Sequence, residues 1–514
     1  MSAPDTPRSG PIRKIVVVGG GTSGWMAAAA LARMIEHAGV SVTLVESDEI
    51  GTVGVGEATV PFIRTFNGLL ELDEDDFIRH TQGTFKLGIE FVDWSSRGSR
   101  YIHPFGTYGV DLQGIRFHQF WRKLRHIGDP DAETLESYNL CAVAARMNRF
   151  MRPRGGPAAV LATLRYAFHF DAGLYAAYLR RYSEARGVRR IEGKVVDVRQ
   201  RPEDGFITEL VLQDGRTIEG ELFLDCSGFR SLLLGRKLNI GFEDWSHWLP
   251  CDRAVAVPCE SVSPLLPYTR STADEAGWRW RIPLQHRTGN GYVYCSEFLT
   301  DDAARGRLMS ELDAPALAEP RVLTFNAGHR HKLWDKNCVA LGLAGGFIEP
   351  LESTSIHLVQ IGIARLLALF PDLSFPAVAR QAYNRYMADQ YCRIRDFIVL
   401  HYKATERNDS PFWRRCRDLT VPDSLQAKID LFRHNGCVLQ DPEDLFSEHS
   451  WVAVMLGQGI TPVGYDPLVD SLPLEGVRKF LNHVKDVTGK TAAAMPRHED
   501  FIEQSCRAAK IPTR

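Results

Sequence analysis

A glycine-rich turn near the amino terminus constrains the fold of this chain more than any other segment. Ile15–Val18 is a short apolar, β-branched run, and a G-x-G-x-x-G pattern separates it from the helix-like segment Trp25–Met34. Glycines at these positions permit a tight turn and let backbone N–H groups approach a pyrophosphate at the start of a helix. The residues predicted to contact a cofactor in this turn are Gly19, Gly21, Thr22, Ser23 and Gly24.

The next segment completes a βαβ unit. Ser41–Glu46 has the character of a second strand and ends on a carboxylate 22 residues after Gly24. An acidic side chain at this place in a dinucleotide-binding fold holds a ribose hydroxyl, so Glu46 is predicted to bind the ribose. Strand, turn, helix and acid in register predict that the chain binds a dinucleotide.

Two further turns favour FAD over NAD. Gly54–Thr59 is a second glycine-rich turn, and Asp225–Gly228 closes the apolar strand Leu222–Leu224, as in many flavoproteins with two dinucleotide-binding domains. Each turn taken alone also suits an ordinary loop. The other residues predicted to contact FAD are Gly56, Glu57, Ala58, Asp225, Gly346 and Ser353.

The composition argues against several classes of function. The chain of 514 residues is 44% hydrophobic and 24% charged, with a formal net charge of −2, and nucleic-acid or membrane-surface binding usually requires a basic excess. The sequence contains no uninterrupted apolar run of about 18 residues, so no transmembrane helix is predicted. The ten cysteines include no C-x-x-C pair, which argues against a disulfide framework or a metal site. Residues 1–10 lack the apolar core of a signal peptide, so we expect a cytoplasmic protein.

The order of the expected elements indicates an α/β fold. Lys194–Arg199 and Glu209–Gln213 alternate like antiparallel strands, and Val339–Leu343 reads as another strand. After Pro350 the pattern becomes helical, and Gln381–His401 is the most regular helix.

These elements predict two modules. A Rossmann-type FAD module with two-dinucleotide-binding topology is expected at residues 1–104 and 156–374. Residues 105–155 and 375–514 are expected to form a mainly helical substrate-binding module, and Arg97–Leu112 is expected to be a loop rich in glycine and tyrosine.

The string Trp278–Pro283 reads as a strand that ends at proline, with two indoles on one face and two arginines on the other. Two aromatic rings on one strand face most often belong to core packing. The pattern W-x-W-x-I-P nevertheless resembles a signature of the flavin-dependent tryptophan halogenase family, and its residues are Trp278, Trp280, Ile282 and Pro283. Seven other segments resemble that family in the same order: Gly19–Trp25, Gly54–Pro61, Thr84–Trp94, Tyr101–Gly106, Phe168–Leu179, Leu224–Leu233 and Gly342–His357.

The resemblance implies a halogenating enzyme that works with reduced FAD. In this family, reduced FAD, oxygen and chloride or bromide yield hypohalous acid, which passes through a protein tunnel to an aromatic substrate. Lys86 would be the catalytic lysine that hydrogen-bonds the hypohalous acid or forms a haloamine with it. An amine beside a dry cavity has a depressed pKa, which suits both tasks. Without its matched segment, Lys86 would be interpreted as an exposed lysine at a strand edge.

The segment Phe347–Ser355 carries the second catalytic group that the resemblance implies. Its proline and hydroxyls also suit an ordinary helix start. By resemblance, Glu352 would orient the halogenating agent and accept the ring proton, which requires a positioned carboxylate. Backbone N–H groups of Thr354 and Ser355 would hold the halide, because a helix N-terminus favours an anion. Ser353 would link the flavin side to the substrate side.

Two departures from the family concern the halide and the substrate. Ser355 stands where tryptophan-specific members have glycine, so a halide pocket of different size, with a preference for bromide, is expected. The paired tyrosines and the Phe-Trp segment that grip free tryptophan have no counterpart, and Leu445–Trp451 stands in their place. The expected substrate is therefore an indole-type aromatic, larger or peptide-bound rather than free tryptophan. The predicted substrate contacts are His103, Phe105, Phe446 and Trp451.

Two other functions share parts of this pattern. An aromatic flavin hydroxylase has the same nucleotide module but needs no catalytic lysine, and the family places Trp278 and Trp280 where they obstruct direct oxygen transfer. A non-catalytic FAD-fold binding protein of the Rab-escort kind has no reason to keep both Lys86 and Glu352. Since the chain shows no second nucleotide domain for NAD(P)H, a separate flavin reductase is the expected partner. The chain is also compatible with a homodimer.

Overall fold

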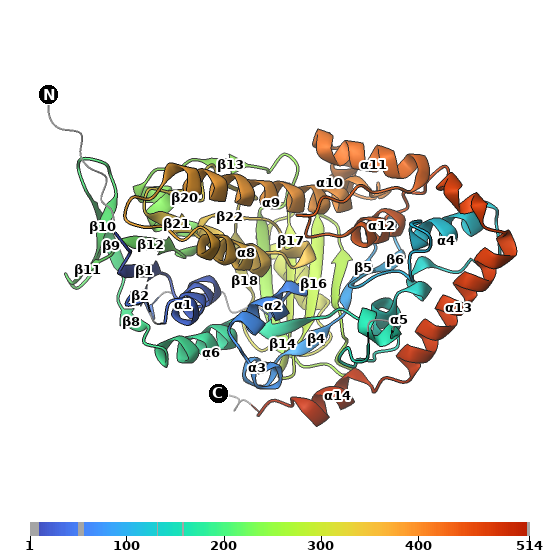
Figure 1. Ribbon diagram of the computed structural model, residues 1–514, viewed down its shortest axis with the longest axis horizontal. Helices are drawn as coiled ribbons and strands as arrows, with labels where there is room; N and C mark the ends of the chain where they lie inside the picture. The colour runs from blue at the N-terminus through green and yellow to red at the C-terminus, as the bar shows by residue number, and fades with distance from the viewer. Residues whose placement is uncertain (1–9, 37, 50–55, 131, 157–158, 511–514) are drawn as a thin grey trace.

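A mostly parallel sheet carries the dinucleotide-binding unit in the computed structural model, which describes residues 10–36, 38–49, 56–130, 132–156 and 159–510. Its strand order is β20-β21-β12-β1-β2-β8, and all neighbours pair in parallel except the hairpin β20–β21. The strands are β1 (Lys14–Val18), β2 (Ser41–Glu46), β8 (Arg189–Glu192), β12 (Leu222–Asp225), β20 (Trp334–Asp335) and β21 (Cys338–Ala340). The predicted βαβ unit is confirmed, since α1 (Thr22–Met34) connects β1 to β2 (Figure 1).

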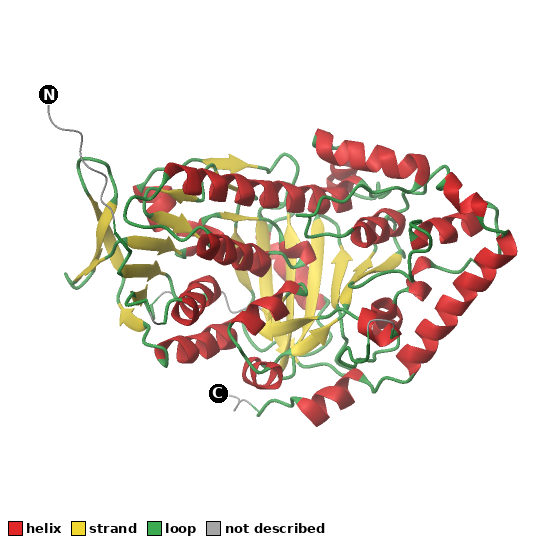
Figure 2. Cartoon of the chain, viewed as in Figure 1, coloured by secondary structure: helices red, strands yellow, loops and turns green. Residues whose placement is uncertain are grey.

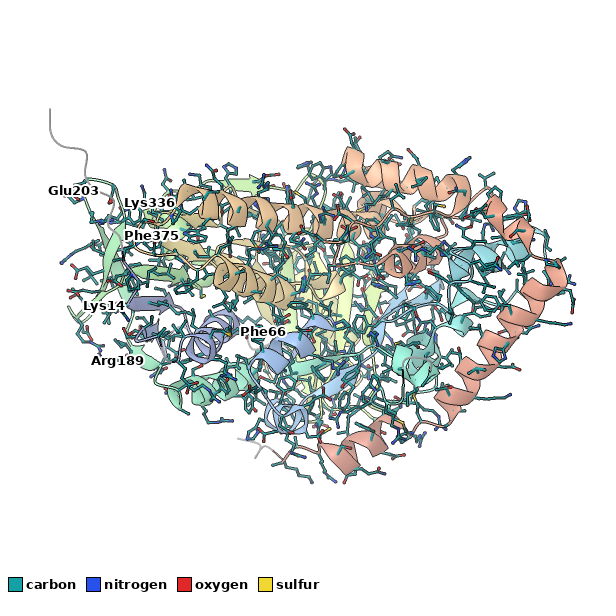
Figure 3. The ribbon with its side chains drawn as sticks, viewed as in Figure 1. Lys14, Phe66, Arg189, Glu203, Lys336 and Phe375 are labelled. Atoms are coloured by element: carbon teal, nitrogen blue, oxygen red, sulfur yellow. The ribbon has the colours of Figure 1, made fainter. Side chains whose placement is uncertain are left out.

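A small antiparallel sheet extends from this end of the molecule. It contains β9 (Val195–Gln200), β10 (Ile207–Leu212) and β11 (Thr217–Glu219). The alternating pattern predicted the antiparallel pair β9 and β10, and β11 is an additional strand. Figure 3 shows Lys14 and Arg189 at the surface of this end, while the Phe66 ring is buried in the interior. Among the described residues no helix combines the length and apolarity needed to cross a membrane.

A seven-stranded sheet forms the middle of the molecule (Figure 1). Its order is β18-β14-β17-β16-β15-β5-β6, and only β15 and β5 pair in parallel. The strands are β5 (Gly88–Val92), β6 (Arg100–Pro104), β14 (Arg253–Glu260), β15 (Thr269–Ala273), β16 (Gly277–Pro283), β17 (Arg287–Tyr294) and β18 (Arg321–Thr324). The predicted loop at Arg97–Leu112 is wrong where β6 lies, because Tyr101, Ile102 and His103 are buried in register with β5.

Two three-stranded sheets connect these layers. One has the order β3-β7-β4, with β3 (Gly56–Ala58), β4 (Thr84–Lys86) and β7 (Ala167–Asp171). The other contains β13 (Phe242–Asp244), β19 (Gly328–Arg330) and β22 (Gly346–Phe347). β3 and β4 both pair with β7, so the second glycine-rich turn and the predicted catalytic lysine lie on one small sheet.

Helices cover the sheets and make up most of the carboxyl-terminal part, as the periodicity predicted (Figure 2). Those in the first half are α2 (Phe62–Leu69), α3 (Glu74–Thr81), α4 (Phe117–His126), α5 (Leu140–Arg146) and α6 (Ala172–Glu184). Those in the second half are α7 (Asp301–Ser310), α8 (Ser355–Ala368), α9 (Ala377–Lys403), α10 (Pro411–Arg417), α11 (Asp423–Asn435), α12 (Glu448–Gly457), α13 (Leu474–Ala493) and α14 (His498–Ser505).

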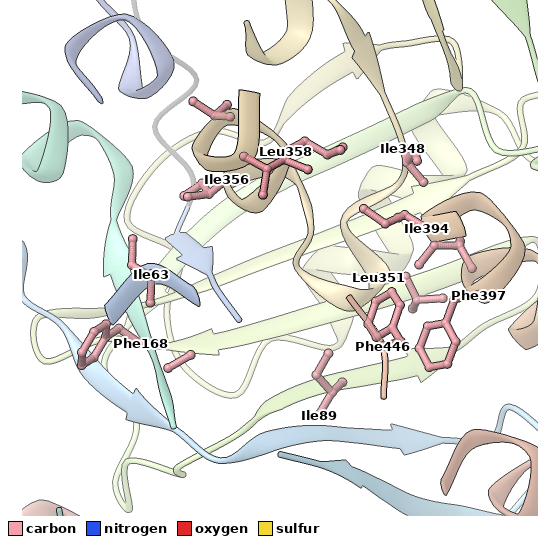
Figure 4. Packing of buried hydrophobic residues seen from close by; sticks show 14 of the residues in the cluster. Ile63, Ile89, Phe168, Ile348, Leu351, Ile356, Leu358, Ile394, Phe397 and Phe446 are labelled. Carbon is pink, nitrogen blue, oxygen red and sulfur yellow. The ribbon is translucent and has the colours of Figure 1, made fainter. Parts of the chain in front are cut away.

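The long helix α9 contacts both halves of the molecule. It packs against α8 and β20 on the side of the parallel sheet, and against α10, α11 and α12 on the other side. One continuous hydrophobic core runs through both halves, and Figure 4 shows Ile394 and Phe397 of α9 within it. The predicted boundary between the two modules at residue 375 stays a prediction, because α9 packs against elements of both predicted modules.

Candidate active site

A cavity of about 440 Å³ opens at the carboxyl ends of β1 and β2 and reaches β16. Its walls come from the turn before α1, from β3, from the loop after β12 and from the start of α8. Cavities of this size hold small ligands and cofactors. The predicted cofactor residues that line it are Gly19, Gly21, Thr22, Ser23, Glu46, Gly56, Glu57, Ala58, Gly346 and Ser353.

The glycines of the first turn suit a dinucleotide in two different ways. Gly21 precedes α1, and a Cβ atom there would meet no atom within 4 Å, so a ligand can approach its backbone closely. Gly24 does not line the cavity, and a Cβ atom there would lie 1.8 Å from the carbonyl oxygen of Gly19. Gly24 therefore lets α1 pack on the turn, and its predicted cofactor contact stays a prediction.

The two predicted acidic residues differ in their relation to the cavity. Glu46 ends β2 and lines the cavity, and its Oε1 accepts a hydrogen bond from Arg190 Nε at 2.5 Å. Asp225 lies outside the lining, and its buried carboxylate accepts hydrogen bonds from the backbone N–H groups of Leu233 and Leu234 at 2.9 and 2.8 Å. Asp225 shapes the loop that follows β12, and its contact with the cofactor stays a prediction.

The second glycine-rich turn is described from Gly56 onward, and Gly54 and Val55 lie outside the described residues. β3 places Gly56, Glu57 and Ala58 along the cavity wall. Desolvation raises the pKa of Glu57 to about 7. A carboxyl group with such a pKa exchanges a proton near neutral pH, which is common beside reactive cofactors.

The strand β16 runs beside the cavity with the W-x-W-x-I-P motif. Trp278, Trp280 and Ile282 line the cavity, and the two indole centroids are 6.1 Å apart. Pro283 does not line it, and its carbonyl oxygen accepts a hydrogen bond from Thr84 Oγ1 at 2.8 Å. The predicted strand that ends at proline is confirmed.

Lys86 is fully buried on β4, so its interpretation as an exposed lysine is wrong. Its Nζ donates hydrogen bonds to the carbonyl oxygen of Thr59 at 3.0 Å and to Ser353 Oγ at 2.8 Å. Ser353 lines the cavity whereas Lys86 does not, so the serine connects the amine to the cavity. Burial lowers the pKa of Lys86 to about 7, although the charge of Glu352 acts in the opposite direction. A neutral amine is therefore available near pH 7.

The turn before α8 places the remaining predicted groups. A short 3-10 segment, Pro350–Glu352, precedes Ser353, whose φ of +61° lies in the left-handed region. A non-glycine residue keeps this conformation only when its surroundings hold it. Thr354 is buried, and its Oγ1 has no hydrogen-bond partner among the described residues, while Ser355 begins α8 and lines the cavity. Free backbone N–H groups in the first turn of a helix suit an anion at this place.

Glu352 lies between two buried histidines. Nδ1 of His103, on β6, donates hydrogen bonds to both carboxylate oxygens at 2.9 and 3.0 Å. Nε2 of His401, on α9, lies 2.9 Å from Oε1, in a bent approach rather than a linear hydrogen bond. Burial raises the pKa of Glu352, but the charge and hydrogen bonds of His103 and His401 outweigh this effect and lower the pKa to about 2. The carboxylate is therefore ionised throughout the neutral range.

The predicted substrate residues surround this carboxylate only in part. Phe446 stacks on Phe397 with 3.8 Å between ring centroids (Figure 4). Trp451 meets the same Phe397 ring edge-on, with 4.9 Å between centroids. The His103 ring lies 6.1 Å from that of Phe446. Phe105 lies nearer to the lysine, with its ring centroid 5.4 Å from Lys86 Nζ.

Three residues near the site, His401, Tyr402 and Glu349, were given no role by the sequence-based prediction. His401 contacts Glu352, and Tyr402, the next residue on α9, donates a hydrogen bond to Glu349 Oε2 at 2.5 Å. Trp278 Nε1 donates to the same oxygen at 3.0 Å. Only the end of the predicted Gln381–His401 helix hinted at His401, because a histidine and a tyrosine there interrupt an otherwise apolar run.

The geometry defines a flavoprotein-type cavity with a buried lysine and a buried carboxylate beside it. The sequence matches the tryptophan halogenase family model over residues 14–474. Tryptophan 6-halogenase SttH from Streptomyces toxytricini is 36% identical over 517 residues, covering 95% of this chain and 97% of that protein. The chain belongs to the tryptophan halogenase family, whose members are FAD-dependent oxidoreductases.

Solved structures agree with this assignment. Xcc4156, a flavin-dependent halogenase from Xanthomonas campestris, is 48% identical and has a TM-score of 0.94, with 98% of this chain and 100% of that chain covered. BrvH, a flavin-dependent halogenase from Brevundimonas sp. BAL3, is 46% identical and has a TM-score of 0.92, with 97% and 99% covered. The predicted α/β fold with a Rossmann-type FAD module is confirmed.

Proposed function

We propose that this protein halogenates an indole-type aromatic substrate with chloride or bromide, through hypohalous acid that reaches Lys86. The observation that carries the proposal is the burial of Lys86 and Glu352 outside the cavity lining, with Ser353 between the lysine and the cavity. The arene is thus expected to react apart from the flavin. The cavity fits FAD, since open backbone at Gly21 and the carboxylate of Glu46 meet the needs of a dinucleotide.

Reduced FAD from a separate reductase, held by the cavity lining, would give two electrons to oxygen, and the oxygen so activated would oxidise the halide, with oxidised FAD, hypohalous acid and water as the products. The start of α8 would hold the halide, because the helix N-terminus and the unpaired Thr354 hydroxyl attract an anion. The Ser355 side chain narrows this place compared with glycine, so a preference between chloride and bromide is expected to depend on it.

Lys86 and Glu352 would carry the transfer to the ring. The Lys86 amine hydrogen-bonds the hypohalous acid or takes its halogen as a haloamine, a role that needs the neutral form available near pH 7. The ring carbon gains a bond to halogen as the halogen–oxygen bond breaks, and it loses its proton to Glu352. That proton then joins the hydroxide released from the hypohalous acid, so water is the other product. A carboxylate with a pKa of about 2 is a weak base, but the halogenated ring cation is a strong acid and needs no stronger one.

The aromatic residues favour a substrate that presents only its ring. Phe446 and Trp451 pack on Phe397, so this part of the site is apolar. Free tryptophan needs charged or polar partners for its ammonium and carboxylate groups. An indole without that charged end, or an indole within a larger molecule, fits better.

Two alternatives remain distinct from the proposal. A flavin hydroxylase would place its substrate beside the flavin, and Trp278 and Trp280 fill one wall of the cavity there. A non-catalytic FAD-binding protein gains nothing from burying an amine and a carboxylate at a cost in desolvation.

The test combines reduced FAD, oxygen, bromide or chloride and a panel of indoles, with products identified by mass spectrometry. Lys86→Ala should lower halogenation by at least about 100-fold while FAD is still bound and reoxidised. Lys123→Ala is the matched control, because Lys123 is a buried lysine of α4 that donates to backbone carbonyls away from the cavity. Oxygenated product without halogen would show a hydroxylase instead, and normal halogenation by Lys86→Ala would refute the mechanism.

A further inference from the structure

We propose that His401 is a positioning residue for halogenation, which holds the Glu352 carboxylate in place from helix α9. The inference rests on the proposed function and concerns a residue outside the lysine–glutamate pair. Its ring is fully buried, and its Nε2 lies 2.9 Å from Glu352 Oε1.

The contacts of His401 determine which ring nitrogen faces Glu352. Its Nδ1 is 2.8 Å from the carbonyl oxygen of Phe397, and a carbonyl oxygen only accepts, so Nδ1 carries a proton. Its Nε2 then faces Glu352 Oε1 at 2.9 Å, without the geometry of a linear hydrogen bond. His401 therefore contacts the carboxylate from α9 through one defined ring nitrogen.

His103 contacts the same carboxylate from a different element. Its Nδ1, on β6, lies 3.0 and 2.9 Å from the two Glu352 oxygens. A buried carboxylate without polar partners is expensive. The two histidines therefore hold Glu352 from β6 and from α9, and His401 supplies the contact from the helix.

Two other ionisable groups act on Glu352 or respond to its charge. Lys86 on β4 interacts with Glu352 through its charge, but burial lowers its pKa to about 7, so it loses that charge near neutral pH. Tyr101 on β6 stays neutral, because burial and the Glu352 charge raise its pKa. The charges and hydrogen bonds of His103 and His401 are what lower the pKa of Glu352.

The ring of His401 is held by its surroundings. It packs against Phe91 with 4.8 Å between centroids and against Phe397 at 5.3 Å. Its backbone carbonyl accepts a hydrogen bond from Gln458 Nε2 at 2.9 Å. These contacts fix the position of Nε2, and Nε2 in turn fixes the position of Glu352 relative to α9.

The experiment compares the full-length wild type with His401→Phe, which keeps a ring, and His401→Gln, which keeps a polar side chain without charge. Halogenation of indole with bromide is measured from pH 5 to pH 8 with saturating reduced FAD. His329→Phe is the matched control, because His329 is also buried and packs on Tyr391 of α9 at 5.1 Å. A cyclic 1,3-diketone traps free hypobromous acid and reports its formation separately.

In His401→Phe, kcat for indole should fall at least about tenfold with little change in KM, while trapped hypobromous acid stays at the wild-type level. His401 is one of the groups that lower the pKa of Glu352, so its loss should raise that pKa, and the rate should also decline toward pH 5 where the wild type stays level. The kcat of His401→Gln should lie between those of His401→Phe and the wild type, and the kcat of His329→Phe should match that of the wild type.

Each outcome decides one point. If the wild type forms no brominated indole, the proposed function fails before His401 is tested. If His401→Phe keeps the wild-type kcat and pH profile, the inference is overturned. If His401→Phe does not retain FAD, His401→Gln decides: a lower kcat with the new acid-side decline supports the inference, and a wild-type profile overturns it.

Discussion

Lys86 and Glu352 are ionisable groups whose environments act on them in opposite directions. Burial without a close partner charge lowers the pKa of Lys86 to about 7, and the histidines lower that of Glu352 to about 2. The amine can therefore be neutral while the carboxylate is charged at the same pH. Pairs of groups whose pKa values are shifted apart in this way are typical of sites where one residue reacts as a nucleophile and another accepts a proton.

The buried amine predicts how stability depends on pH. The folded pKa of Lys86 is about 7 and its ordinary value is 10.5, so between these pH values the unfolded chain binds more protons. Wild-type stability should rise with pH in this window, by up to about 1.4 kcal/mol per pH unit relative to Lys86→Met. Urea unfolding of both proteins at pH 7, 8 and 9 measures the difference. Parallel pH curves for the two proteins would contradict the burial of a neutral amine.

The tryptophan motif predicts unequal effects of two similar substitutions. Trp278 is buried and donates to Glu349, a buried carboxyl group whose pKa desolvation raises to about 7, whereas Trp280 is only partly buried. Trp278→Phe should cost about 1–3 kcal/mol of stability, and Trp280→Phe less. Both should retain more halogenation than Lys86→Ala. Denaturant unfolding and product yield test the order, and equal costs would exclude the Glu349 contact as the cause.

At the scale of elements, the short turns before α1 and before α8 create the site. Glycines shape the first turn, and Ser353 in a left-handed conformation shapes the second. Both turns lead into a helix whose first N–H groups are free for an anion. The same kind of turn is thus proposed to bind a pyrophosphate before α1 and a halide before α8.

The first turn predicts different consequences for two glycines in one motif. Gly24→Ala would press a methyl group against the carbonyl oxygen of Gly19, so it should destabilise the fold by at least about 1–3 kcal/mol. Gly21→Ala meets no protein atom, so stability should change little while FAD affinity falls. Thermal unfolding without FAD and titration with FAD separate the effects. A stable Gly24→Ala protein would contradict the packing role.

Sequence patterns predicted the elements of the cofactor module well. The strand, turn and helix around Gly21 follow from local chemistry, and so does the strand at Trp278, because apolar alternation and proline mark its ends. The contacts of Asp225 and His401 could not be predicted in this way. Each depends on segments distant in sequence, and Asp225 turned out to hold its own loop while His401 reaches Glu352 from α9.

At the scale of the whole molecule, the proposed reaction site at Lys86 and Glu352 lies outside the lining of the cavity, and we expect the reducing power to come from a separate protein. We expect no rapid NADH oxidation by the purified protein, and halogenation only after a flavin reductase and free FAD are added. Oxygen uptake and product formation, measured with and without the reductase, test this. Rapid NADH oxidation by the protein alone would refute the expected partnership.

Helix α9 also sets a limit on how this chain can change in length. His401 and Tyr402 are neighbours on one helix, yet they contact two different carboxylates, Glu352 and Glu349. Inserting one residue before them would turn both side chains by about 100° around the helix axis and release both carboxylates at once. Insertions and deletions that reshape the substrate side are therefore expected to be tolerated after Lys403, in the segments that follow α9, and rejected within the helix itself.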